Sequence, residues 1–257
     1  MRFAGGAAVV TGGGQGIGAA VARALAAEGG AVVVAGRTAP KLEATAEAIR
    51  ATGRSAWAAQ CDVTDPTSVR ALAEAAARHL GHVNILINNA GVAHSAPLHR
   101  LTLDDWNRVF AVNATGTFLC TQAFLPGMLD GKWGRIVNVA SVAGLHGARY
   151  IAAYSAAKHA VIGFTRSVAA EVAGTGVTCN AVCPGFVDTA MTRDSVERVI
   201  AKTGKSREEA LAALLATTSQ PRLIPPESVA ASILSLCDRR SDHINGEAIT
   251  LDGSAPP

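Results

Sequence analysis

The sequence predicts a single α/β domain built on a doubly wound, mostly parallel sheet of seven strands with helices on both faces. Short β-rich runs alternate with longer Ala- and Leu-rich helical stretches along the 257 residues, which is typical of parallel α/β folds. Several of the β-rich runs are apolar without alternation, which indicates strands covered on both faces. The composition, 49% hydrophobic and 17% charged, suits a globular protein with a large core. We therefore expect one domain over residues 1–257.

The individual elements follow from this alternation. The strand candidates are rich in Val, Ile and Ala, and they lie at residues 7–12, 31–36, 55–63, 83–91, 134–141, 177–185 and 247–253. Helices are expected between them at residues 15–28, 39–51, 66–80, 103–129, 153–173 and 226–238. Two of these helices have clear start signals, Asp65-Pro66 and Pro225-Pro226, because proline is favoured in the first helical turn.

One segment, residues 186–224, is longer than a tight connection between two elements. It contains the helix-like run SREEALAALLA, and a long excursion of this kind usually forms a lid or a binding loop. Its basic and acidic residues are interleaved. A solvated helical surface explains this pattern better than a dedicated anion site, with a coenzyme A phosphate as the alternative.

Composition also excludes several function classes. The net charge is +3, from 23 basic and 20 acidic residues without a basic block, so we expect no nucleic-acid partner. No apolar run approaches the ~18 residues of a membrane helix, and no His, Asp and Glu cluster has metal-ligand spacing. The five cysteines include no C-x-x-C pair, which favours reduced thiols in a cytoplasmic protein.

A glycine-rich loop, TGGGQGIG, follows the first predicted strand and opens the first predicted helix. In this context Gly12 allows a sharp turn, Gly16 allows the backbone to approach a phosphate, and Gly18 allows the helix to pack closely on the sheet. The free N–H groups of the helix N-terminus would then bind a pyrophosphate. The loop predicts a Rossmann-type dinucleotide site, and the absence of G-K-[ST] argues against a P-loop.

The end of the second strand indicates which dinucleotide is bound. A free ribose 2′-hydroxyl is usually held by an acidic residue at this point, but the sequence has Arg37 and Thr38 after Gly36. A guanidinium binds phosphate through a bidentate fork, so NADP(H) is favoured and NAD(H) is the alternative. The competing interpretation is a solvated arginine at a strand end.

Four polar residues are placed where chemistry is expected. Ser141 ends the fifth predicted strand, at the sheet edge that lines the ligand crevice of open α/β folds. Asn113 lies inside a predicted helix, although asparagine is a poor helix former. Tyr154 and Lys158 are four residues apart, so a helix carries both on one face. Each residue taken alone fits a structural role, and their combination favours a catalytic one.

Together these motifs resemble the short-chain dehydrogenase/reductase family. The resemblance rests on the order TGGGQGIG, NNAG (88–91), Asn113, Ser141, Y-x-x-x-K and PG (184–185), and it extends over nearly the whole chain. The segment NAVCPGFVDTAM is most similar to β-ketoacyl and polyketide ketoreductases and to hydroxyacid dehydrogenases. The resemblance implies an NADP(H)-preferring oxidoreductase that interconverts a small-molecule ketone and a secondary alcohol. It also implies a homotetramer in which helices 103–129 and 153–173 pack between subunits.

The resemblance also implies roles for the four polar residues. Tyr154 would be the general acid and base, and Lys158 would stabilise its phenolate and hold the nicotinamide ribose. Such help is needed because a free tyrosine has a pKa of about 10, too high to cycle near neutrality. Ser141 would hydrogen-bond the substrate oxygen, and Asn113 would hold a water that links Lys158 to solvent.

The cofactor-binding set follows from the same resemblance. Asp62 and Val63 would meet the adenine, and Thr189 with the PG segment would hold the carboxamide. The full set is Gly12, Gln15, Gly16, Ile17, Gly18, Arg37, Thr38, Asp62, Val63, Asn89, Ala90, Gly91, Tyr154, Lys158, Pro184, Gly185, Val187 and Thr189.

The sequence departs from the family pattern in two places. Gln15 stands where many NADP-using relatives have a basic residue, so recognition of the 2′-phosphate is expected to rest mostly on Arg37. The C-terminal LDGS is followed by Ala-Pro-Pro rather than by glycine and an aromatic residue. His94, His99 and His146 lie in loops near the expected site, and we assign them no role.

Two alternative functions stay open from the sequence. An NAD-dependent hydroxyacid or alcohol dehydrogenase of the same family would differ mainly in its use of Arg37. A non-catalytic regulatory protein that binds a dinucleotide would have no need for Asn113, Ser141, Tyr154 and Lys158 together. The substrate depends on three loops, residues 92–102, 142–152 and 186–224, whose shapes a single sequence does not determine.

Overall fold

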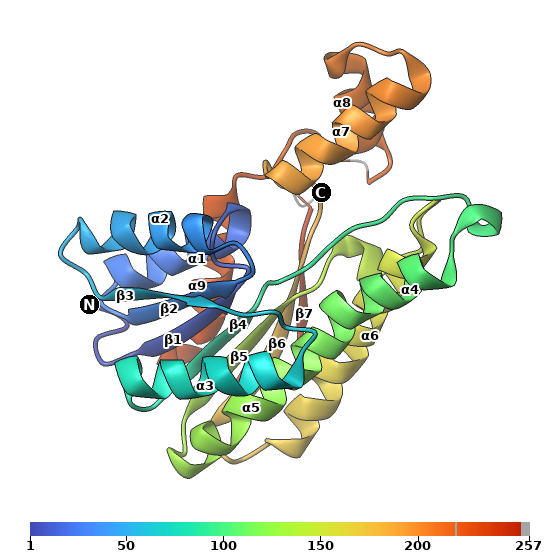
Figure 1. Cartoon of the computed structure of the whole chain (residues 1–257). Coiled ribbons are helices and arrows are strands. Elements are labelled where there is room, and N and C mark those ends of the chain that lie inside the picture. The colour runs from blue at the N-terminus through green and yellow to red at the C-terminus, as the bar shows by residue number, and fades with distance from the viewer. Residues whose placement is uncertain (219, 253–257) are drawn as a thin grey trace.

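The computed structural model describes residues 1–218 and 220–252, and within them seven strands form one sheet (Figure 1). The strands are β1 (Ala7–Thr11), β2 (Ala31–Gly36), β3 (Ala56–Gln60), β4 (Ile85–Asn88), β5 (Gly134–Val139), β6 (Val177–Pro184) and β7 (Ala248–Leu251). All adjacent strands are parallel, in the order β3-β2-β1-β4-β5-β6-β7. The predicted doubly wound sheet is confirmed. Its strand order reverses between β1 and β4, where such folds bind ligands.

Helices cover both faces of this sheet, as the sequence predicts (Figure 1). One face packs against α1 (Gly16–Ala27), α2 (Ala39–Arg50) and α9 (Pro226–Cys237), and the other packs against α3 (Pro66–Leu80), α5 (Gly116–Asp130) and α6 (Ala152–Glu171). Successive strand residues supply the two cores, because side chains alternate across a strand. In β1, Val10 belongs to the first core and Val9 to the second, and both are fully buried.

Two predicted strands end three residues earlier than expected, which is the largest difference from the predicted carboxyl ends. The run at 55–63 forms a strand only as far as Gln60, and the run at 83–91 only as far as Asn88. The residues that follow leave the sheet because their backbone forms the wall of the cavity described below.

The helix predicted over 103–129 is interrupted. It consists of α4 (Leu103–Phe110), a π-helical turn (Ala111–Thr115) and α5. Asn113 lies in this turn, and its side-chain amide donates to the carbonyls of Val109 at 2.9 Å and Val92 at 2.8 Å. This competition for backbone acceptors widens the helix at one turn, and such bulges are frequent at functional sites.

The long excursion forms two helices, α7 (Ala190–Thr203) and α8 (Arg207–Ala216), which project beyond the sheet (Figure 1). A capping box between Ser206 and Glu209 starts α8. At the base of the excursion, Val187 bridges Ile224 and the side chain of Gln220 hydrogen-bonds the backbone of Phe186. The assignment of one domain over residues 1–257 stays a prediction. Gly253 and the Ala-Pro-Pro end lie outside the described residues.

The remaining features agree with the composition. The five cysteines all lie within the described residues, where they are buried and unpaired. No helix in the described part of the chain has both the length and the apolar character needed to span a bilayer.

Candidate active site

A cavity of about 290 Å³ opens at the carboxyl edge of the sheet. It is lined by the ends of β1, β2, β4, β5 and β6, by the start of α1, by part of α6 and by the beginning of the long excursion. The sequence-predicted residues that line it are Gly12, Gln15, Gly16, Ile17, Arg37, Thr38, Asp62, Val63, Asn89, Ala90, Gly91, Asn113, Ser141, Tyr154, Lys158, Pro184, Gly185, Val187 and Thr189. Of the predicted set, only Gly18 is not part of the lining.

The glycine loop forms one end of this cavity. Gly12 and Gly16 have φ angles of +65° and +54°, which side chains other than glycine rarely adopt. A Cβ at Gly12 would lie 2.8 Å from the Asn89 amide nitrogen, which itself donates to the carbonyl of Gly12 at 3.2 Å. The loop is therefore held open and close to the NNAG segment, leaving a bare backbone cradle that a pyrophosphate fits.

Gly18 supports the loop from behind rather than lining the cavity. A Cβ there would lie 2.4 Å from the Gly12 carbonyl oxygen, so only glycine lets α1 start this close to β1. Gln15, at the N-cap of α1, makes no side-chain cap bond. The uncapped N-terminus of α1 thus faces the cavity and can bind an anionic group.

The end of the cavity that is expected to hold the adenosine, called the adenosine end below, lies between the ends of β2 and β3. Arg37, Thr38 and Asp62 are all part of its lining. The Asp62 carboxylate accepts from the Thr64 backbone at 2.9 Å and from the Thr64 hydroxyl at 2.8 Å. These hydrogen bonds, with a smaller contribution from the charge of Arg37, hold the pKa of Asp62 below its usual value. Asp62 therefore stays ionised near Arg37.

Sequence reasoning missed several lining residues, of which Lys41 is the one with a charge. It lies in the first turn of α2, four residues after Arg37. A lysine four residues after Arg37, at the start of a predicted helix, was the sequence signal that could have identified it. Val92, Val112, Met191 and Thr192 were also missed. They lie in the 92–102 loop, in the π-helical turn and in the first turn of α7, which no local pattern brings to the cavity.

The catalytic candidates meet at the other end of the cavity. Ser141 hydrogen-bonds Tyr154, and its hydroxyl also accepts from the Ala143 backbone at 3.1 Å. The Lys158 ammonium lies 5.7 Å from the centre of the Tyr154 ring and donates to the Val139 carbonyl at 2.7 Å. Since α6 carries Tyr154 and Lys158 one turn apart, the register predicted from sequence is the one observed.

Asn113 reaches the same region through the π-helical turn. A Cβ at Gly91 would lie 2.9 Å from the side-chain oxygen Oδ1 of Asn113 and 3.6 Å from the Lys158 ammonium. Gly91 therefore leaves space between these two groups, and any larger residue would fill it.

Burial dominates the electrostatics of this end. It raises the pKa of Tyr154, and the hydrogen bond from Ser141 opposes this rise. It lowers the pKa of Lys158 to about 8, because a buried ammonium loses its hydration. The sequence analysis expected a lowered pKa for Tyr154, but in the protein without its cofactor burial raises this pKa.

The three histidines do not line the cavity. His94 lies 3.5 Å from the Asp105 carboxylate, next to Arg108, and this contact ties the 92–102 loop to α4. Among the described residues, no group of three His, Cys, Asp or Glu side chains is arranged to hold a metal ion.

The parallel sheet, the glycine loop and the polar residues at the sheet edge define a dinucleotide-binding oxidoreductase of the doubly wound class. Residues 6–199 match the family model for short chain dehydrogenases. The chain belongs to the short-chain dehydrogenase family, and it is an NAD(P)-dependent oxidoreductase.

Individual relatives are similar over nearly their whole length. The chain is 38% identical to the short-chain reductase protein NovJ of Streptomyces niveus, over 97% of this chain and 93% of the relative. It is 40% identical to a 3-oxoacyl-(acyl-carrier-protein) reductase of Synechocystis, over 96% and 95% of the two chains. Among solved structures, the actinorhodin polyketide ketoreductase with NADPH has a TM-score of 0.93 at 35% identity, covering 98% of this chain and 97% of that one.

Proposed function

We propose that this protein is an NADPH-dependent ketoreductase that converts a ketone on an acyl or polyketide-type substrate into a secondary alcohol. The observation that carries the proposal is the convergence of Ser141, Tyr154 and Lys158 in one cavity with the glycine loop and Arg37. Relatives named as polyketide ketoreductases and 3-oxoacyl reductases support the substrate class, and the relative solved with NADPH supports the cofactor.

When bound, the nicotinamide supplies the hydride for the reduction. Tyr154 donates a proton to the substrate oxygen as negative charge develops on it. The Ser141 hydroxyl, already in contact with Tyr154, donates a second hydrogen bond to the same oxygen and stabilises its charge. In the oxidation direction Tyr154 accepts the proton.

Lys158 supplies protons to Tyr154 and lowers its pKa. Its ammonium lies 5.7 Å from the centre of the tyrosine ring and donates to the Val139 carbonyl, and it would also hold the ribose of a bound cofactor. A cation at this position favours the phenolate and so lowers the pKa of Tyr154. We propose that a water in the space beside Gly91, held by Asn113, passes protons between Lys158 and solvent.

The proposal also covers the location of the protein and its oligomeric state. We propose a cytoplasmic homotetramer in which the outer faces of the α4–α5 region and α6 pack between subunits. Phe118 of α5 supports this assignment: its side chain is 42% exposed and makes an edge contact with Phe164 of α6 at 6.2 Å. Apolar side chains exposed along two adjacent helices are typical of an interface.

The reaction is tested by following NADPH absorbance with a panel of acyl, cyclic and aromatic ketones. Consumption of NADPH with at least one class, and much slower turnover with NADH, supports the proposal. Equal rates with NADH would favour the NAD-dependent dehydrogenase. Silence across the panel, with NADPH binding intact, would favour a non-catalytic dinucleotide-binding protein.

A further inference from the structure

We propose that Lys41 is a second ligand of the cofactor's 2′-phosphate and that Gln15 positions its ammonium for this purpose. The inference rests on the proposed NADPH preference, and it adds a second residue to the sequence-based expectation that recognition of the phosphate rests mostly on Arg37. Three observations on the exposed Lys41 side chain support the inference: its position, its charge and its hydrogen bond to Gln15.

The position of Lys41 is fixed by close packing. Lys41 lies in the first turn of α2, and this turn packs against the glycine loop: a Cβ at Gly14 would lie 3.1 Å from the Lys41 Cβ. The Lys41 ammonium donates to the Gln15 side-chain oxygen at 2.7 Å. Both residues line the cavity, so this hydrogen bond holds the ammonium beside the glycine loop.

The charge balance at this end requires a second cation. Four charged side chains among the described residues line the cavity: Arg37, Lys41, Asp62 and Lys158. Lys158 belongs to the catalytic end. At the adenosine end, the ionised Asp62 interacts electrostatically with Arg37 and offsets part of its charge. Lys41 restores a net positive charge, which a doubly negative phosphate monoester needs.

The electrostatics of the α2 N-terminus do not explain a lysine at position 41. A cation in the first turn of a helix opposes the helix dipole, and this first turn contains no acidic residue. Thr38 at the N-cap makes no side-chain cap bond. No acidic residue of this first turn neutralises the positive end of α2, which therefore attracts an anion held beside Arg37, Thr38 and Lys41.

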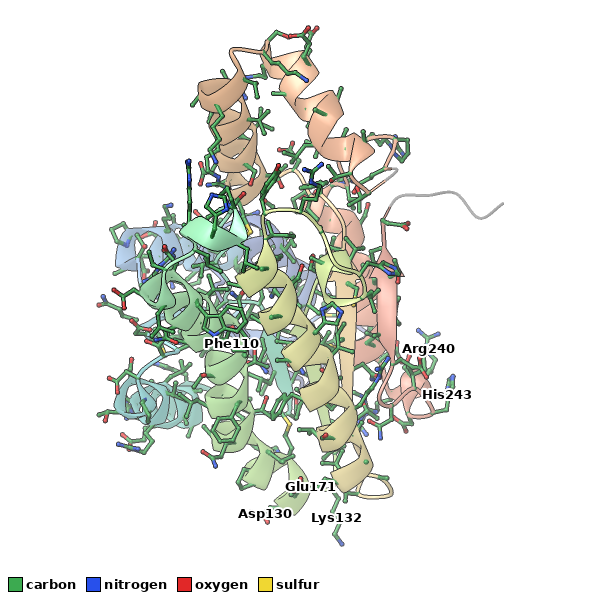
Figure 2. The ribbon with its side chains drawn as sticks, turned by 90° about the vertical axis from the view of Figure 1, so that its right-hand side faces the viewer. Phe110, Asp130, Lys132, Glu171, Arg240 and His243 are labelled. Atoms are coloured by element: carbon green, nitrogen blue, oxygen red, sulfur yellow. The ribbon has the colours of Figure 1, made fainter. Side chains whose placement is uncertain are left out.

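The test compares cofactor binding to the full chain without substrate, so it does not depend on ketoreductase activity. Lys41→Met removes the charge and keeps the length of the side chain, whereas Lys41→Arg keeps the charge. Lys132→Met is the matched control, because Lys132 lies at the end of the molecule opposite α7 and α8 (Figure 2). Dissociation constants for NADPH and NADH are measured by calorimetry, with 2′,5′-ADP and 5′-ADP as minimal probes.

We expect Lys41→Met to weaken NADPH and 2′,5′-ADP by about tenfold, as for loss of one charged hydrogen bond, and to leave NADH and 5′-ADP within about twofold. Lys41→Arg and Lys132→Met should bind like the parent. Added salt should weaken NADPH binding less steeply in Lys41→Met than in the parent. Equal weakening of both nucleotides, or no weakening of either, would overturn the proposal.

The positioning role of Gln15 has its own readout. Gln15→Ala should weaken NADPH by a smaller factor than Lys41→Met, because the ammonium remains but is no longer held. The double variant should match Lys41→Met alone, since Gln15 acts through Lys41. Additive losses in the double variant would show that Gln15 contacts the cofactor independently.

Discussion

At the scale of single residues, we propose that the phenol of Tyr154 carries out the proton transfer. Tyr154→Phe removes the proton donor and leaves the ring that packs in the cavity. We expect the turnover number to fall by about 10² to 10⁴, the usual contribution of a positioned general acid. The NADPH dissociation constant should stay close to that of the parent. Turnover equal to the parent would exclude Tyr154 as the acid.

Lys158 predicts a pH dependence of stability. Burial lowers its pKa from 10.5 to about 8, so between these values the unfolded chain binds more protons than the folded one. Below pH 8 the buried, charged Lys158 lowers the free energy of unfolding of the cofactor-free protein. This destabilisation decreases as the pH rises from 8 towards 10.5, because Lys158 loses its charge in the folded state first. Lys158→Met removes this cost at every pH.

The free energy of unfolding reports the effect in urea titrations of both proteins. We expect Lys158→Met to be the more stable protein at pH 7, with its advantage shrinking by about 1 kcal/mol by pH 9, at ~1.4 kcal/mol for each unit of pKa shift. An advantage that stays constant or grows over this range would contradict the assignment of a lowered Lys158 pKa.

At the scale of elements, two helical glycines make a matched comparison. Gly18 of α1 has no room for a Cβ, because the Gly12 carbonyl lies 2.4 Å away, whereas Gly163 of α6 has no atom within 4 Å of that position. Gly18→Ala should lower the free energy of unfolding by about 1–3 kcal/mol and weaken cofactor binding by displacing the glycine loop. Gly163→Ala should raise the free energy of unfolding by about 0.5–1 kcal/mol. Both are measured by urea unfolding, and similar effects would refute the close packing of α1 on β1.

Elements whose signals are local were the ones predicted correctly. The apolar strands, the glycine loop and the Tyr154–Lys158 spacing each depend on neighbours within a few residues, so one sequence defines them. The π-helical turn depends on Asn113 bonding to Val92, twenty-one positions earlier in the chain. Lys41 needed the packing of α2 on the glycine loop. Such contacts between separate elements leave no periodicity to detect.

At the scale of the whole molecule, the exposed ring of Phe118 predicts association. Phe118→Glu places a charge on the proposed interface, where it would be buried against a neighbouring subunit at a large desolvation cost. We expect light scattering to show a mass below that of a tetramer. Leu98→Glu, which changes another exposed apolar residue outside α5 and α6, should leave the mass unchanged. An unchanged mass for Phe118→Glu would remove this face from the interface.

The base of the long excursion has a wider consequence. Gln220 accepts from the Phe186 backbone at 2.8 Å and donates to the carbonyls of Phe186 at 2.7 Å and Arg222 at 2.6 Å, so one side chain joins the two ends of the segment. Between these two ends, Thr189, Met191 and Thr192 still line the cavity, whereas residues 193–216 do not. The outer part of the excursion, residues 193–216, can therefore differ in length or sequence while the residues that line the nucleotide cavity stay the same.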